Sequence, residues 1–171
     1  VIRNIRVNQG QHYFDLEFNS NVVNDIHLGI PGNHNIYNAV AVFALGIQLG
    51  IDLEVIKESL ATFRGVKRRF EYHLKNNSLV YIDDYAHHPK EIEACLSSVK
   101  QLFPDKKITV VFQPHLFSRT NDFMDDFATS LSSVDELILL DIYPARELPI
   151  KGVTSSVLLD KVKCANKTLL A

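Results

Sequence analysis

The stretch LVYIDDYAHHPKE, residues 79–91, decides how the rest of the chain is organised. Residues 79–82 are apolar and favour a buried β-strand, and Pro89 suits the first turn of a helix, where a missing N–H costs little. The polar residues between them predict a loop that joins a strand to a helix. Because ligands in open α/β sheets bind at the carboxyl ends of strands, this loop is a candidate site.

Two interpretations of this loop fit its composition. Asp83, Asp84 and His88 are each able to cap the following helix, whose first N–H groups and dipole favour an acceptor. Capping needs one or two side chains, whereas four of the six residues 83–88 are acids or histidines, which favours a functional loop. Such groups also bind divalent metals, but no cysteine lies nearby, and contacts to a nucleotide or another substrate explain the pattern at least as well.

The composition is that of a soluble globular protein. The 171 residues are 46% hydrophobic and 22% charged, with a net charge of −2. The absence of a basic stripe gives no reason to expect nucleic-acid binding, and no apolar run is long enough to span a membrane. Cys95 and Cys164 fall in expected helices and form no disulfide framework, which favours a reducing, cytoplasmic setting. Because the chain opens at Val1 directly in a strand-like pattern, we expect it to be part of a longer protein.

The first third of the chain predicts a β-meander followed by helices. Short alternating runs in residues 2–30 are separated by turn residues at 8–10 and 19–21. Apolar residues then predict a buried helix that ends at Gly50. A second helix is expected to begin after Asp52 and to continue through Leu60.

The first turn of the earlier helix carries His34, Asn35 and Asn38. His34 and Asn38 share one face at a spacing of four residues, and Asn35 lies three residues before Asn38. Side-chain amides offer both donors and acceptors, as the edge of a purine requires. A plain helix cap with a satisfied buried histidine explains the same residues equally well.

A hinge is predicted at residues 63–69, within the sequence FRGVKRRF. Glycine followed by three cations is a poor interior for a helix or strand, and the composition changes after it. We therefore expect one domain over residues 1–62 and another over residues 70–171. A hinge arginine is well suited to reach phosphates in a cleft between domains.

The region after the hinge predicts an α/β fold with a Rossmann-like, mostly parallel sheet flanked by helices. Strands are expected at 71–74, 79–82, 107–112 and 136–141, and helices at 89–102, 121–131 and 155–162. The last three strands each end in a polar loop, so these loops are expected to share one rim, and the sheet is expected to be unfinished at Ala171. The sequence contains no dinucleotide fingerprint, no P-loop and no nucleophilic-serine elbow.

Five ordered motifs resemble the Mur ligase family. They are GNHNIYNAVAVFALG, FRGVKRRFE, IDDYAHHPKEI, FQPHLFSRT and IYPARELPIKG, and the resemblance covers nearly the whole chain from Gly29 to about Val157. It implies the end of a central ATPase domain followed by most of a Rossmann-like C-terminal domain. It also implies a reaction in peptidoglycan precursor synthesis, in which ATP and Mg²⁺ activate UDP-N-acetylmuramate as an acyl phosphate and L-alanine forms the amide.

The same resemblance implies roles for individual residues. His34, Asn35 and Asn38 are expected to hold adenine, Arg69 to contact phosphates or ribose, and Asp84 to contact the ribose hydroxyls. The residues expected on the muramoyl-alanine side are Tyr85, His87, His88, His115 and Arg119. His88 and Arg119 are also catalytic candidates, and Arg119 matches a carboxylate geometrically. No metal ligand is assigned, because those of Mg²⁺ are expected upstream together with the P-loop.

The chain alone is therefore expected to be inactive. The alternatives are a murein tripeptide recycling ligase of the same family, a non-catalytic nucleotide-binding module, and a metal-dependent hydrolase. The hydrolase would use Asp83, Asp84, His87 and His88, and a stoichiometric transition metal would identify it.

Overall fold

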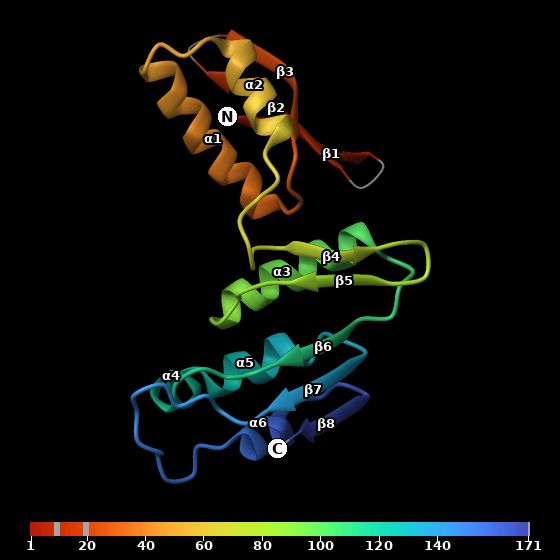
Figure 1. The fold of residues 1–171 in the computed structure, drawn as a ribbon, viewed down its shortest axis with the longest axis vertical. Coiled ribbons are helices and arrows are strands. Elements are labelled where there is room, and N and C mark those ends of the chain that lie inside the picture. Colours follow the sequence, from red (N-terminus) through yellow and green to blue (C-terminus); the bar gives the residue numbers. More distant parts are fainter. Residues whose placement is uncertain (9–10, 19–20, 171) are drawn as a thin grey trace. The chain divides into compact units, whose positions relative to one another are not determined.

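The computed structural model describes residues 1–8, 11–18 and 21–170. The chain forms two compact units, Val1–Tyr85 and Ala86–Ala171 (Figure 1). Among the described residues, no helix has the length and apolar character that crossing a bilayer requires.

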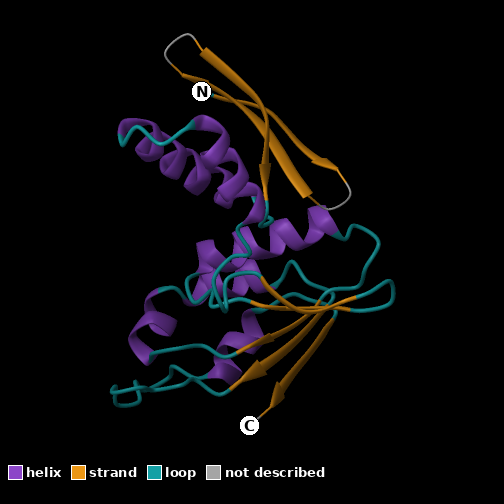
Figure 2. Ribbon diagram, turned by 45° about the horizontal axis from the view of Figure 1, so that its top comes forward, coloured by secondary structure: helices purple, strands orange, loops and turns teal. Residues whose placement is uncertain are grey.

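The first unit begins with an antiparallel sheet of strands β1 (Ile2–Asn8), β2 (Gln11–Phe18) and β3 (Asn21–Leu28), in that order. This confirms the predicted meander, whose turns at 9–10 and 19–20 lie outside the described residues. Helices α1 (Asn33–Gln48) and α2 (Leu53–Thr62) lie on one side of the sheet (Figure 2). Phe14 and Ile26 of the sheet share a core with Phe43 of α1 and Ile56 of α2.

The two helices begin in different ways. Asp52 caps α2 as predicted, because its Oδ1 accepts hydrogen bonds from the backbone N–H groups of Glu54 (2.9 Å) and Val55 (3.4 Å). In contrast, α1 begins at Gly32 with φ of 105° and no side-chain cap. His34 and Asn35 therefore do not cap their own helix.

Strands β4 (Glu71–Lys75) and β5 (Val80–Asp83) form a separate antiparallel hairpin. The prediction that residues 79–82 join the parallel sheet was wrong. The Asn76 side chain accepts hydrogen bonds from Ser78 N (2.9 Å) and Leu79 N (2.8 Å), which fold the chain back on itself. The ladder hydrogen bonds of β5 are consequently made with β4.

The second unit confirms the α/β class, with a parallel sheet in the order β6-β7-β8 and flanking helices. Its elements are α3 (Pro89–Leu102), β6 (Thr109–Phe112), α4 (Phe117–Asp122), α5 (Met124–Leu131), β7 (Glu136–Leu140), α6 (Ser155–Lys161) and β8 (Asn166–Leu170). Phe112, Phe127, Leu137 and Leu158 lie in its core.

Three details of this unit differ from the sequence predictions. The sheet has a third parallel strand, β8, which the sequence did not predict, because only two apolar residues mark that short strand. That the sheet is unfinished at Ala171 stays a prediction. The predicted helix at 121–131 is divided into α4 and α5 by the non-helical backbone of Phe123. Cys164 follows α6 rather than lying in it, because Val162 is extended and ends the helix.

Candidate functional site

The five residues expected to bind the nucleotide all belong to the first unit. In the first turn of α1, Asn35 Nδ2 donates a hydrogen bond to the Pro31 carbonyl (2.6 Å), and Asn38 Nδ2 donates a long one to Asn35 Oδ1 (3.4 Å). Within the described part of the chain, Asn38 Oδ1 accepts no hydrogen bond. The two amides are thus coupled, and one acceptor remains for a ligand.

His34 lies in the electrostatic reach of Asp84 and Arg69. Partial burial lowers the pKa of His34, Asp84 opposes that shift, and Arg69 reinforces it. The net lowering keeps the ring neutral at pH 7, so that it presents one donor and one acceptor. Three of the five predicted residues, His34, Arg69 and Asp84, are therefore near enough for their charges to interact.

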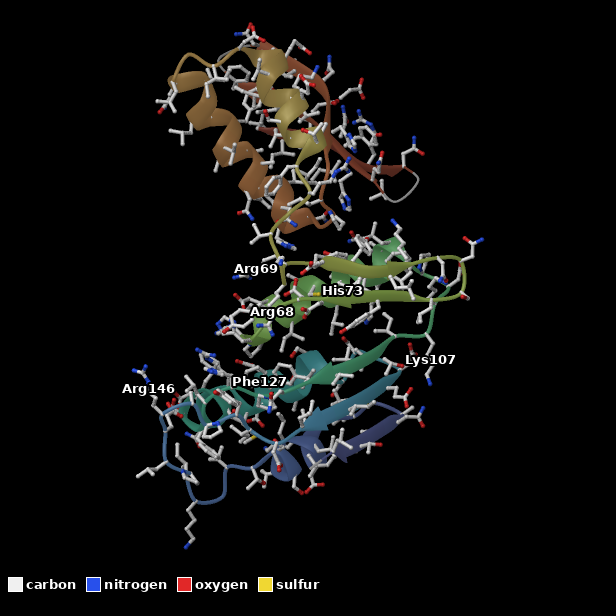
Figure 3. All side chains as sticks on the ribbon, in the orientation of Figure 1. Arg68, Arg69, His73, Lys107, Phe127 and Arg146 are labelled. Atoms are coloured by element: carbon white, nitrogen blue, oxygen red, sulfur yellow. The ribbon has the colours of Figure 1, made fainter. Side chains whose placement is uncertain are left out.

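The hinge sequence is hydrogen-bonded to the loop that follows β5. Asp84 Oδ2 accepts a hydrogen bond from Phe70 N (2.8 Å), and Tyr85 N donates to the Arg68 carbonyl (2.7 Å). The Arg68 guanidinium lies 5.3 Å from the centre of the Tyr85 ring. Arg68 and Phe70 have positive φ angles of 59° and 52°, so Arg69 stands between two left-handed residues. Figure 3 labels Arg68 and Arg69, which precede β4 in the chain.

His87 and His88 lie at the start of α3 in the second unit. Glu91 Oε2 accepts hydrogen bonds from the backbone N–H of His87 (2.9 Å) and of His88 (3.2 Å), and it lies 3.3 Å from His87 Nδ1. His88 Nδ1 in turn accepts from Lys90 N (3.3 Å), which completes a capping box. The capping interpretation is therefore confirmed for His88, whereas the Asp84 carboxylate binds Phe70.

The loops that follow β6 and β7 lie side by side. His115 pairs with Tyr143 in an isolated parallel bridge, and their rings stack with centres 5.5 Å apart. Leu116 N donates to the Tyr143 carbonyl (2.9 Å), and Tyr143 N donates to the Pro114 carbonyl (2.8 Å). This confirms a shared rim for two of the three polar loops. A common rim for all three stays a prediction, because β5 belongs to the other unit.

Glu147 holds the helix that carries Arg119, a role that the sequence did not reveal. Its carboxylate accepts hydrogen bonds from Ser118 N (2.9 Å) and from Ser118 Oγ. These bonds lower the pKa of Glu147, and the nearby Arg119 charge contributes to the same effect. No local sequence pattern predicts that Glu147, 29 residues away, accepts hydrogen bonds from Ser118. The spacing of His88 and Glu91, in contrast, is a capping-box pattern that a sequence does show.

The predicted hydrolase set is not supported. Among the described residues, the convergent group of potential metal ligands is Glu71, His73 and Asp83, on the β4–β5 hairpin. A hollow of about 610 Å³ lies between α3 and α5, where Leu96, Lys100 and Thr129 contribute to its wall; Pro89, which follows His88, also lines it.

The chain is similar to longer proteins and matches only part of their length. It is 51% identical to the UDP-N-acetylmuramate–L-alanine ligase of Christiangramia forsetii over 168 residues, 98% of this chain and 37% of the relative. It is also 51% identical to the same-named ligase of Flavobacterium psychrophilum, over 99% of this chain and 38% of the relative. The chain thus spans little more than a third of these relatives.

Solved structures share the fold. The UDP-N-acetylmuramate–alanine ligase of Thermotoga maritima matches with a TM-score of 0.80 and 31% identity, over 99% of this chain and 37% of that one. A murein peptide ligase from Psychrobacter arcticus matches with a TM-score of 0.62 and 24% identity, over 99% of this chain and 35% of that one. Folylpolyglutamate synthase of Mycobacterium tuberculosis, complexed with ADP, matches with a TM-score of 0.75 and 16% identity, over 99% and 37%. The last two likenesses concern the fold alone.

The family model that matches the chain is described as "Mur ligase, glutamate ligase domain" and covers residues 68–169. That range is more than half of the chain, and it contains three of the five motifs on which the resemblance rested, together with the end of a fourth, FRGVKRRFE. The match confirms that resemblance, and the chain belongs to the Mur ligase family.

Proposed function

We propose that this chain is part of an ATP-dependent ligase that joins L-alanine to UDP-N-acetylmuramate in peptidoglycan precursor synthesis. The observation that carries the proposal is the 51% identity, over nearly the whole chain, to relatives that bear this name. The murein tripeptide ligase is the second candidate, but the solved murein peptide ligase has lower identity and a lower TM-score than the alanine ligase.

The proposed chemistry has two steps. A muramoyl carboxylate oxygen attacks the γ-phosphorus of ATP, which forms an acyl phosphate and releases ADP. The amine of L-alanine then attacks the acyl carbon, the C–N bond forms, and the C–O bond to phosphate breaks. The amine loses a proton to complete the amide, and positioned cations stabilise the charge on the transferring phosphoryl group.

The nucleotide is assigned to the first unit. Asn38 Oδ1, which accepts no hydrogen bond within the described residues, is a suitable acceptor for the amino group of adenine. Neutral His34 supplies a further donor and acceptor. Asn35 supports Asn38, Arg69 pairs with phosphates or ribose, and Asp84 receives the ribose hydroxyls. The Phe70 contact of Asp84 supports this role by fixing its carboxylate.

The muramoyl-alanine side is assigned to Tyr85 of the first unit and to His87, His88, His115 and Arg119 of the second. Arg119 is the proposed clamp for the alanine carboxylate, because a guanidinium makes two parallel hydrogen bonds to that group. Its support is Glu147, which fixes the adjacent Ser118.

Mg²⁺ would neutralise the phosphates of ATP in this reaction. Among the described residues, the convergent group of potential metal ligands includes the imidazole of His73, whereas Mg²⁺ prefers oxygen ligands. No step is therefore assigned to Mg²⁺ through that group.

The test is alanine-dependent phosphate release by the longer protein that contains this chain, with UDP-N-acetylmuramate as acceptor. Arg119→Ala is expected to lower kcat/KM for L-alanine by about 10- to 100-fold, the value of a hydrogen bond to a charged group. The matched control is Arg146→Ala, an exposed arginine of the neighbouring loop, which is expected to change little.

Each alternative predicts a different outcome of that assay. A strong preference for a tripeptide over L-alanine would favour the recycling ligase. Nucleotide binding without phosphate release in the longer protein would favour a non-catalytic module. The 171-residue chain, which contains no P-loop motif, is expected to release no phosphate. ATP-analogue shifts at residues 34–38 and 69–84 in NMR spectra would support the assigned half-site.

A further inference from the structure

Two carboxylates and an imidazole converge on one face of the β4–β5 hairpin. Glu71 and Asp83 are directly opposite each other in the antiparallel ladder. His73 lies two residues after Glu71 on the same strand, at the register shift between Tyr72 and Leu74. Figure 3 shows His73 on this hairpin, with Arg68 just before it in the chain.

The distances leave room for an ion between these side chains. His73 Nε2 lies 3.9 Å from Glu71 Oε2 and 3.8 Å from Asp83 Oδ2, too far for hydrogen bonds. One ligand atom from each residue lies within 4.8 Å of the other two. Such a triangle has a point about 2 to 2.5 Å from each atom, close to the roughly 2.0–2.2 Å at which Zn²⁺ binds imidazole nitrogen and carboxylate oxygen.

The negative charges of Glu71 and Asp83 also favour binding of a cation between them. Like charges directly opposite each other in a sheet destabilise it. Arg68 partly offsets this repulsion, since its backbone N–H donates to Glu71 Oε2 (2.8 Å) and its Nε lies 3.7 Å from Asp83 Oδ2. The Arg68 side chain is 65% exposed, however, and a long, exposed ion pair contributes little. A metal ion is able to replace it at Asp83 while the backbone bond to Glu71 remains.

We propose that Glu71, His73 and Asp83 form a binding site for a divalent transition metal, with Zn²⁺ as the best match. Mixed nitrogen and oxygen ligands suit Zn²⁺ better than Mg²⁺, and water completes the coordination at this half-exposed position. The ion joins the two strands of the hairpin. None of its three residues is among those assigned to adenine or to alanine, although Asp83 directly precedes Asp84, and the proposed site does not depend on the proposed ligase activity.

The test is titration of the 171-residue chain with Co²⁺, whose visible absorption reports tetrahedral coordination, followed by displacement with Zn²⁺. We expect one equivalent of Co²⁺ to give this spectrum, and Zn²⁺ but not Mg²⁺ to abolish it. His73→Ala and Asp83→Asn are expected to lose the spectrum. The matched control is His115→Ala, which removes an imidazole of the other unit and is expected to keep it.

A second measurement separates loss of the site from loss of the fold. Zn²⁺ is expected to raise the Tm of the wild-type chain and of His115→Ala, but to leave that of His73→Ala unchanged, with the far-UV circular dichroism of all three alike. Because metal ligands must be deprotonated, the Zn²⁺ effect is expected to weaken in acid. Equal Co²⁺ binding by His73→Ala and wild type, or no saturable binding by wild type, would overturn the proposal and leave an ion-pair cluster only.

Discussion

His12 on β2 is completely buried, and neither of its ring nitrogens has a hydrogen-bond partner among the described residues. An unpaired buried polar group costs about 1–3 kcal/mol, whereas an apolar side chain of similar size carries no such cost. His12→Leu is therefore expected to raise the free energy of unfolding by about 1 kcal/mol in urea denaturation at pH 7.5. His12→Gln, which keeps a polar group, is the control and should not stabilise. A destabilised Leu variant would show that the imidazole has a partner, such as buried water.

The same residue predicts how stability depends on pH. Burial lowers the pKa of His12, and the nearby His34 lowers it further. The unfolded imidazole therefore takes up a proton at a higher pH than the folded one. The contribution of neutral, buried His12 to the free energy of unfolding is complete above the ordinary histidine pKa of about 6.5. It is lost as the pH falls toward the lower pKa that His12 has in the folded chain. Between pH 7.5 and 5, urea denaturation is expected to show a smaller loss for His12→Leu than for wild type; an equal loss would contradict the assignment.

Helix α4 depends on a carboxylate from a distant loop. Glu147→Ala removes both carboxylate oxygens that accept hydrogen bonds from Ser118 N and Oγ. Glu147→Gln keeps one oxygen acceptor and replaces the other with an amide nitrogen. We expect faster amide hydrogen exchange at Ser118 in the order Ala, Gln, wild type. The matched control is Glu93→Ala, which removes an exposed partner of Lys90 on α3 and should leave Ser118 unchanged.

Acid is expected to act on α4 in the same direction. Because the pKa of Glu147 is lowered in the folded chain, its stabilising effect is present above the ordinary glutamate pKa. The effect is lost as pH falls through the folded value. Ser118 exchange, corrected for its intrinsic pH dependence, should therefore become less protected in acid in wild type but not in Glu147→Ala. Unchanged wild-type protection would contradict this.

Helix starts could be predicted from the sequence, whereas contacts between residues far apart in the chain could not. The Asp52 cap and the start of α3 at Pro89 were predicted correctly, because each is decided within three or four residues. The pairing of β5 with β4 was missed, since the Asn76 turn competes with a parallel arrangement that an apolar strand fits equally well. The Glu147 cap was missed because it joins residues far apart in the chain.

On the scale of the whole chain, each unit has its own buried core. Phe43 is 1% exposed in the core of the first unit, and Leu131 is 0% exposed in that of the second. Truncating either to Ala removes a large buried side chain and is expected to cost about 2–5 kcal/mol. Residue-resolved hydrogen exchange should then show lost protection in β1–β3 for Phe43→Ala and in β6–β8 for Leu131→Ala. Equal loss in both units from either variant would contradict separate cores.

The predicted domain boundary and the division of the folded chain fall at different residues. A hinge at residues 63–69 and domains at 1–62 and 70–171 remain predictions, while the contacts of the folded chain divide it after Tyr85. The composition change at the Gly65 segment is a local signal. The hydrogen bonds that tie Phe70 and Arg68 to Asp84 and Tyr85 depend on folding and leave no such trace.

The cap at the start of α3 fixes the tautomer of His88. Its Nδ1 accepts the Lys90 N–H, so a neutral ring must carry its proton on Nε2. His88 then offers an approaching oxyanion a proton donor, and it has no lone pair left with which to act as a general base.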